Sequence, residues 1–373
     1  MNAMLPRRDG PATPGGPAPP APDMPPAPIG QAPARVRRWF DTAADAVIPD
    51  YDGSLGTARV AADAYARRAK AANTRRAYRV GVRAWCAWCD AHALPCLPAN
   101  AADVVAFLAA ERGRGLSVNT LDLRRAAIRY LHFIAGCPVP TAEARVTETM
   151  AGIRRDAADS GDLPAKKLAA TADILRQILA PIPDTLAGLR DRALLLVGFA
   201  GALRRAELAA IRVEHLEASE RGLRLLLPRS KGERSGNSVT VAIPYGATEL
   251  CPVRALRRWL DAAGITSGAV FRRIFLPPHG RDGRTTPLPR VGTAAIDAGT
   301  VARIVKLRAA AAGFDRRAVG GHSLKRGALT TGMDRGVHPT RLKQLGRHKS
   351  YAVLDDYLEL GDPFDGHPLS GVL

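Results

Sequence analysis

Apolar residues recur every three or four positions through much of the first half of the chain, which is the spacing of an amphipathic helix. The first such segment covers residues 73–92, and its apolar side is formed by Tyr78, Val82, Trp85 and Cys89. Further helices are predicted over residues 101–112, 117–133 and 141–155, with glycine or a capping side chain at the breaks. The pattern therefore predicts a helical domain over residues 57–157.

In the second half of the chain, segments with the apolar spacing of helices alternate with segments typical of β-strands. Apolar segments predict helices at residues 171–179, 189–199, 251–263 and 297–312. Between them, residues 223–227 and 239–243 are rich in β-forming residues and flank a glycine-rich turn, which predicts a β-hairpin. The predicted fold class is mainly α with a small β component, in which a helical N-terminal domain precedes a mixed α/β domain over residues 169–373.

Three further segments surround or join these domains. Residues 1–35 contain eleven prolines and few apolar anchors, which predicts a disordered, Pro-rich tail. Residues 36–56 include Trp39 and Phe40 and are predicted to form a short helix or docking arm. Residues 158–168 contain glycine, proline and paired lysines, which predicts an interdomain linker.

The net charge of the chain indicates what kind of molecule it binds. The chain has 54 Lys and Arg against 35 Asp and Glu, a net charge of +19. Such an excess favours a polyanion, and nucleic acid is the first choice because each neutralised phosphate releases counterions. A membrane partner is disfavoured because no apolar run reaches the ~18 residues of a spanning helix. Without a signal-peptide pattern and with an odd count of five cysteines, the chain is predicted to be cytoplasmic.

Three cysteines lie close together in the sequence, with His92 between the second and the third. Cys86, Cys89 and Cys96 have the residue types and spacing of a zinc site. However, Cys89 also follows the helical period of the apolar residues before it, which favours a packed core cysteine. We therefore predict no metal site here.

Two cationic residues in the second domain could act on a phosphodiester. Arg204 follows the apolar helix at 189–199, and its planar guanidinium can bind two phosphate oxygens. Lys231 lies at the tip of the predicted hairpin and can give a proton to a leaving oxygen. Taken alone, an ion pair between Arg204 and Glu207 and an exposed turn lysine are the more ordinary interpretations.

A histidine and two cations are grouped further along the chain. His322 begins a predicted helical segment in which Lys325 and Arg326 stand three and four residues later, on the same face as the histidine. An imidazole with one such cation can orient and neutralise a phosphate whose charge grows in the transition state. For a lone His322, a helix-start histidine bonded to the backbone is the alternative.

A second histidine and a tyrosine stand nine residues apart near the C-terminus. On one continuous helix, nine steps of about 100° would place His348 and Tyr357 on opposite sides. Either the chain bends between them, or His348 lies in the turn before a helix that carries Tyr357, with Ser350 as its cap. A phenol has a pKa of about 10, so it becomes a nucleophile only with a base or with cations that stabilise phenolate.

Together these segments resemble the tyrosine recombinase (phage integrase) family over residues 57–373. Residues 201–208 match the family's first arginine box, with Arg204 as the catalytic arginine, and Lys231 matches the hairpin lysine. Residues 321–324 match the start of the His-x-x-Arg box, and residues 346–357 match the terminal box with its second histidine and nucleophile.

One departure from the family pattern concerns the second arginine. Three residues after His322 the family carries Arg, whereas this chain has Lys325, followed by Arg326. Either Lys325 replaces the arginine, or Arg326 supplies the guanidinium after a small rotation of the helix. Register favours Lys325 and chemistry favours Arg326. A smaller departure is Arg347, which stands between Gly346 and His348.

The resemblance implies a mechanism without cofactor or metal. It assigns Tyr357 the attack on the scissile phosphate, which leaves a 3′-phosphotyrosyl link and frees a 5′-hydroxyl. The remaining implied roles are Lys231 as general acid, Arg204 with Lys325 or Arg326 as phosphate clamp, and His322 and His348 in proton transfer and hydrogen bonding. The implied partner is double-stranded DNA, which the two domains would hold between them. Four copies of the chain would assemble on two DNA sites to exchange strands.

The predicted function is that of a site-specific DNA recombinase, such as the integrase or resolvase of a mobile element. One alternative keeps the chemistry but acts on a single duplex, as a type IB topoisomerase-like enzyme does. A second alternative is a catalytically weakened DNA-binding protein of the same fold, which Lys325 in place of arginine suggests.

Overall fold

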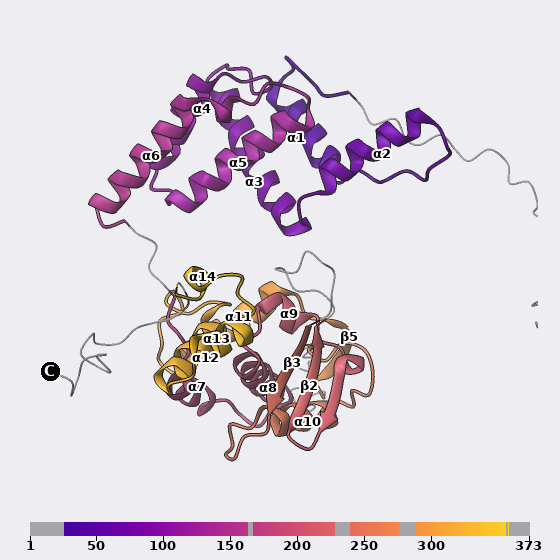
Figure 1. The fold of residues 1–373 in the computed structure, drawn as a ribbon, viewed down its shortest axis with the longest axis vertical. Helices are drawn as coiled ribbons and strands as arrows, with labels where there is room; N and C mark the ends of the chain where they lie inside the picture. The colour runs from indigo at the N-terminus through magenta and orange to yellow at the C-terminus, as the bar shows by residue number, and fades with distance from the viewer. Residues whose placement is uncertain (1–25, 163–166, 228–238, 276–287, 356, 358–373) are drawn as a thin grey trace, which may run out of the picture. The chain divides into compact units, whose positions relative to one another are not determined.

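The computed structural model describes residues 26–162, 167–227, 239–275, 288–355 and 357 (Figure 1). The chain forms two units, residues 1–164 and 165–373, each with its own hydrophobic core. The described part of the first unit is helical, and the second combines helices with two small sheets, which confirms the predicted fold class. Within the described ranges, no helix has both the length and the apolar character needed to cross a membrane.

Six α-helices form the described part of the first unit. They are α1 (Pro33–Ala43), α2 (Leu55–Arg68), α3 (Ala72–Ala91), α4 (Ala101–Gly113), α5 (Val118–Ile134) and α6 (Ala144–Asp159). Helix α3 packs against α5, and a Cβ on Gly81 would lie 2.5 Å from the Ala127 Cβ, so the two backbones approach closely. The side chains of Tyr78, Val82 and Cys89 are buried as the helical period predicted.

Helix α1 corrects the prediction for the start of the chain. It begins at Pro33, inside the segment predicted to be disordered, and it is part of the core: Val36, Trp39 and Phe40 are buried, and the helix packs on α3. Proline suits the first helical position because the N–H that it lacks has no partner there. Only its first three residues were assigned to the tail, because its apolar residues begin after residue 35; the short helix predicted within residues 36–56 is present and ends at Ala43. Residues 1–25 lie outside the described part.

The segment predicted to be a linker is structured at both described ends. Helix α6 continues to Asp159, and the Leu168 backbone N–H donates to the Ala318 carbonyl oxygen at 2.8 Å. The Ala170 backbone N–H donates to the Ser323 carbonyl oxygen at 3.0 Å. The second unit thus begins by residue 168, close to the predicted boundary.

The second unit combines its helices with a three-stranded antiparallel sheet, β1-β2-β3, and a separate β4-β5 pair. The predicted hairpin is confirmed as β2 and β3, with Leu225 opposite Val241. The elements are α7 (Ala172–Leu179), α8 (Leu186–Ala200), α9 (Arg205–Ala209), β1 (Leu216–Ser219), β2 (Gly222–Leu227), β3 (Val239–Pro244), α10 (Pro252–Ala262), β4 (Arg272–Phe275), β5 (Arg290–Ala295), α11 (Ala298–Ala311), α12 (Ser323–Asp334), α13 (Pro339–Gly346) and α14 (Tyr351–Asp355).

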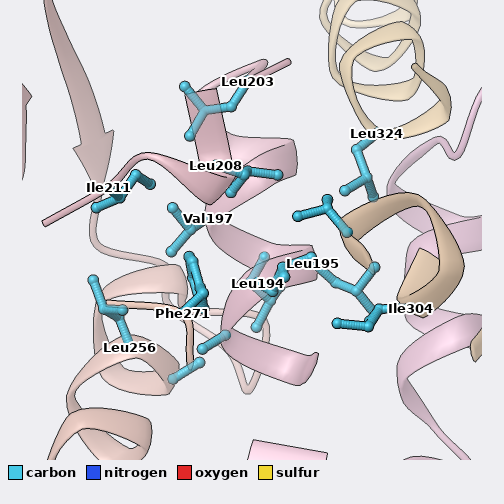
Figure 2. Packing of buried hydrophobic residues seen from close by; sticks show 14 of the residues in the cluster. Leu194, Leu195, Val197, Leu203, Leu208, Ile211, Leu256, Phe271, Ile304 and Leu324 are labelled. Atoms are coloured by element: carbon cyan, nitrogen blue, oxygen red, sulfur yellow. The ribbon is translucent and has the colours of Figure 1, made fainter. Parts of the chain in front are cut away.

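The core of the second unit fixes the segments that carry the candidate site residues (Figure 2). Leu203 and Leu208, on either side of Arg204, are buried in the same cluster as Val197 of α8. Leu324 of α12, which precedes Lys325, belongs to this cluster too. Because buried side chains interdigitate at crystal-like density, these leucines determine the direction of their neighbours.

Gly327 of α12 is expected to tolerate no side chain. A Cβ there would lie 1.8 Å from the Ala170 carbonyl oxygen and 2.7 Å from the Thr171 nitrogen, and backbone atoms cannot rotate away. We therefore expect Gly327→Ala to lower the free energy of unfolding of the second unit by about 3 kcal/mol, the upper end of overpacking costs. Urea denaturation followed by circular dichroism measures this change.

The matched control is Gly152→Ala in α6, where a Cβ would meet nothing within 4 Å. Alanine is favoured over glycine inside a helix by roughly 0.5–1 kcal/mol, so this variant should be slightly more stable than the wild type. Equal effects of the two substitutions would contradict the close approach of α12 to residues 169–171.

Candidate active site

Arg204 is held at a sharp reversal between two helices. Helix α8 ends at Ala200, Ala202 adopts a left-handed conformation with φ of 44°, and Arg204 becomes the N-cap of α9. Its backbone N–H donates to Glu207 Oε2 at 2.8 Å, which gives the short helix one half of a capping box. The position of Arg204 is therefore fixed through both its backbone and its leucine neighbours.

Glu207 also binds the Arg204 side chain. Arg204 Nη1 donates to Glu207 Oε1 at 2.8 Å, so the ion pair considered from the sequence is confirmed. Burial by itself raises the pKa of Glu207, but the Arg347 charge and the hydrogen bonds from Arg204 outweigh it and hold the pKa below its usual value. The carboxylate therefore stays ionised and orients the guanidinium.

Helix α12 brings a histidine and a lysine to the same place. His322 is its N-cap residue, as predicted. Lys325 is fully buried, its Nζ donates to the Gly346 carbonyl oxygen, and Nζ lies 5.3 Å from the centroid of the Tyr357 ring. Burial, followed by the charges of Arg204 and Arg347, lowers the pKa of Lys325 to about 7.

Arg326 is also buried, with 6% of its surface exposed. Lys325 and Arg326 are successive residues of α12, so their side chains leave the helix about 100° apart. Of these two neighbours, Lys325 is the one whose cation lies over the tyrosine ring and feels the charge of Arg204.

Tyr357 lies beside both histidines. Its hydroxyl oxygen is 3.4 Å from His322 Nδ1, and its ring centroid is 4.5 Å from that of His348. His348 lies in the turn after α13, and Tyr357 follows α14, with its backbone N–H donating to the Leu354 carbonyl oxygen at 2.8 Å. Ser350 Oγ accepts the Val353 N–H at 3.3 Å, so His348 does precede a capped helix, as one of the two alternatives predicted. That helix ends at Asp355, however, and Tyr357 lies in the turn after it rather than on it.

His348 is buried and stands among cations. Burial, then the charges of Lys325 and Arg204, lower its pKa to about 4. Neither ring nitrogen has a hydrogen-bond partner among the described residues. The imidazole is therefore neutral near pH 7.

The buried imidazole predicts a pH-dependent stability. The pKa of His348 is about 4 when folded, against about 6.5 in an unfolded chain. Between these values the unfolded state binds more protons, so the free energy of unfolding rises with pH across this window and is lost as pH falls towards 4. The largest contribution is on the order of 3 kcal/mol. Thermal denaturation of the wild type and His348→Asn from pH 4 to 7 measures it, and parallel profiles would contradict it.

The structure brings together five of the seven predicted site residues within the second unit. These are Arg204, His322, Lys325, His348 and Tyr357. Arg326 is buried one step around the helix, and Lys231 lies outside the described residues.

Sequence reasoning gave no role to Arg347, which contacts the same group. Its Nη2 donates to Glu207 Oε2 at 2.7 Å, and its backbone carbonyl oxygen lies 3.4 Å from Arg204 Nη2. The signal in the sequence was an arginine where a helix ends, after Gly346 and before His348, and only the fold reveals its partner.

The cysteine cluster of the first unit is part of its core. Cys86, Cys89 and Cys96 are buried, and Cys86 Sγ lies 3.9 Å from Cys96 Sγ. Across the described ranges, no three His, Cys, Asp or Glu side chains are grouped so that they could hold a metal ion. Packing therefore accounts for the positions of these thiols.

Two models of known protein families match the chain. The phage integrase N-terminal SAM-like domain matches residues 63–135, and the phage integrase family matches residues 170–362. The second match by itself covers more than half of the 373 residues and spans every candidate site residue.

Similar proteins and structures come from the same group. An integrase/recombinase xerD homolog from Selenomonas ruminantium is 33% identical over 309 residues, which are 81% of this chain and 86% of that protein. The recombinase cre of Escherichia phage P1 is 30% identical over 186 residues, 49% of this chain and 53% of that protein. The XerH site-specific recombinase, solved with its palindromic difH substrate, shares the fold with a TM-score of 0.58 at 12% identity, covering 93% of this chain and 98% of that one.

Because one family match spans more than half of the sequence and a recombinase aligns with four fifths of it, the chain belongs to the phage integrase family and is a tyrosine recombinase, a DNA strand transferase.

Proposed function

We propose that this protein is a site-specific DNA recombinase that cleaves and rejoins double-stranded DNA through a 3′-phosphotyrosyl intermediate at Tyr357. One observation carries the proposal. The Tyr357 hydroxyl lies 3.4 Å from His322 Nδ1 while its ring lies beside His348 and the Lys325 cation. A nucleophile, bases and fixed cations in one place are what phosphoryl transfer at a diester requires.

In the cleavage step, Tyr357 Oη attacks phosphorus and forms a P–O bond to the enzyme. The bond from phosphorus to the 5′ oxygen breaks in the same step, and that oxygen leaves as a hydroxyl once it gains a proton. His322 is positioned to accept the phenol proton. Rejoining reverses the step when a 5′-hydroxyl of the partner strand attacks the phosphotyrosine, so the energy of the diester is kept throughout.

Cations stabilise the negative charge that grows on the phosphate. Arg204 uses one Nη1 hydrogen on Glu207 and one Nη2 hydrogen on the Arg347 carbonyl, and the planar group carries further N–H donors for non-bridging oxygens. We assign Lys325 as the second clamp, because its Nζ lies 5.3 Å from the centroid of the Tyr357 ring. We assign Lys231 the role of general acid towards the 5′ oxygen, on the family resemblance alone.

We further propose that four copies act together on two DNA sites. Two duplexes must be cut and exchanged, and one chain supplies one tyrosine per strand, so four strands require four protomers. Light scattering of the protein bound to its target duplex should give a mass of four chains with two duplexes. A mass that stays at one chain per duplex under recombining conditions would exclude the tetramer.

The test of this function is covalent capture. A fluorescent duplex from the DNA flanking the gene, nicked beside the cleavage position, loses the small 5′-hydroxyl fragment and traps the intermediate. We expect a protein–DNA adduct that survives denaturing electrophoresis, with the nucleotide on a peptide that contains Tyr357. Specific binding of this duplex without any adduct would favour the weakened DNA-binding protein. Relaxation of supercoiled plasmid lacking a target site would favour the topoisomerase-like alternative.

A further inference from the structure

Arg347 sits in a backbone conformation that an arginine rarely adopts. It ends α13 with φ of 51° and ψ of 50°, in the left-handed region where glycine is the usual residue. A non-glycine residue there is held against a strain on the order of 1 kcal/mol, which suggests that its side chain makes contacts that a glycine could not make.

Those contacts use all four hydrogens of the two terminal nitrogens. Nη1 donates to the carbonyl oxygens of Gly201 at 3.1 Å and Leu345 at 2.9 Å. Nη2 donates to the carbonyl oxygen of Ala202 at 2.9 Å and to Glu207 Oε2 at 2.7 Å. The side chain thus joins the α8–α9 turn to the end of α13.

The same contacts leave Arg347 little to offer a substrate. Its side chain is only 8% exposed, and burial lowers its pKa despite the Glu207 charge beside it. Arg204 differs, because its side chain is 19% exposed. Its Nη1 donates one hydrogen to Glu207 Oε1 at 2.8 Å, and its Nη2 donates one to the Arg347 carbonyl oxygen at 3.4 Å. Arg347 therefore acts on protein groups rather than on DNA.

We propose that Arg347 is a positioning residue of the recombination site: it holds Glu207 and the α8–α9 turn so that Arg204 faces the phosphate, and it ties this turn to the segment that carries His348 and Tyr357. Because this role presupposes attack by Tyr357 on a phosphodiester, it rests on the function proposed above. Arg204 and Tyr357 come from segments more than 150 residues apart, and Arg347 is a direct link between those segments.

Arg347→Gly is the sharpest test, because glycine removes the side chain and accepts the left-handed backbone without strain. We expect the single-turnover rate of adduct formation on the nicked duplex to fall by about 100-fold, since small misplacements of catalytic groups cost about that much. The dissociation constant for the duplex should change by less than about twofold, because the side chain is only 8% exposed and its terminal nitrogens are bonded to protein groups.

A double-mutant cycle separates positioning from general support of the fold. In an Arg204→Lys background, the guanidinium that Arg347 is proposed to orient is already absent. Adding Arg347→Gly to this variant should therefore slow cleavage by no more than about threefold. Arg347→Lys serves if the glycine variant does not fold: it keeps the charge beside Glu207 but cannot reach four acceptors, so it too should cleave slowly with unchanged DNA affinity.

Two results would overturn this role while leaving the proposed function intact. One is wild-type cleavage by Arg347→Gly. The other is an equal loss in the presence and in the absence of Arg204, which would mark a purely structural contact. If instead the wild type bound its verified site and formed no adduct, the proposed function itself would fall, and the role of Arg347 with it.

Discussion

Replacing Tyr357 with phenylalanine is expected to abolish covalent attachment to DNA and leave folding and DNA binding unchanged. The substitution removes one oxygen, whose contact in the described structure is the 3.4 Å approach to His322 Nδ1. The ring keeps its packing against the cluster of Leu329, Leu342 and Leu354. Loss of the proposed nucleophile should lower the rate of adduct formation by more than about 10⁴-fold, as removal of catalytic nucleophiles does elsewhere.

Tyr351 provides a matched control for this result. It lies six residues earlier at the start of α14, is 46% exposed, and its hydroxyl contacts Thr340 Oγ1 at 2.9 Å. Tyr351→Phe should form the adduct at close to the wild-type rate on the nicked duplex. An adduct that persists in Tyr357→Phe and disappears in Tyr351→Phe would move the nucleophile to the earlier tyrosine and refute the assignment.

Helices were predictable where a strong apolar period met a recognisable boundary. Helix α4 was predicted from residue 101, and Asn100 indeed caps it by accepting the Asp103 N–H. Helix α12 was predicted to begin at His322, which is its N-cap residue. Local sequence decides such features, because the cap and the apolar face lie within a few residues of each other.

What could not be predicted depends on contacts between segments far apart in the chain. The bond between Arg347 and Glu207 joins residues separated by 140 positions, and no local pattern marks it. Strands β4 and β5 were missed because apolar and polar residues do not alternate in their sequences and most of their residues are exposed. The sequence left Lys325 and Arg326 as alternatives for the second cation of the phosphate clamp. The complete burial of Lys325 could not be predicted, because it depends on the packing of α12 against α13.

Lys325 and Arg326 should respond differently when each loses its charge. Lys325→Met keeps the volume of the buried side chain and removes the cation beside Tyr357. We expect the rate of adduct formation to fall by about 10²- to 10³-fold, the usual cost of one preorganised group that stabilises transition-state charge. Arg326→Met, which alters a side chain about 100° away around α12, should lower the rate by less than about tenfold.

The unfolding temperature of each variant is the control for the comparison of Lys325→Met with Arg326→Met. A fully buried ammonium whose pKa is lowered to about 7 by burial and neighbouring cations is a costly group, so Lys325→Met should unfold at the same temperature as the wild type or higher. A slower reaction in a protein that is at least as stable separates catalysis from folding. The opposite outcome, with Arg326→Met the slower enzyme, would mean that α12 rotates when DNA binds and that the guanidinium replaces the lysine on the phosphate.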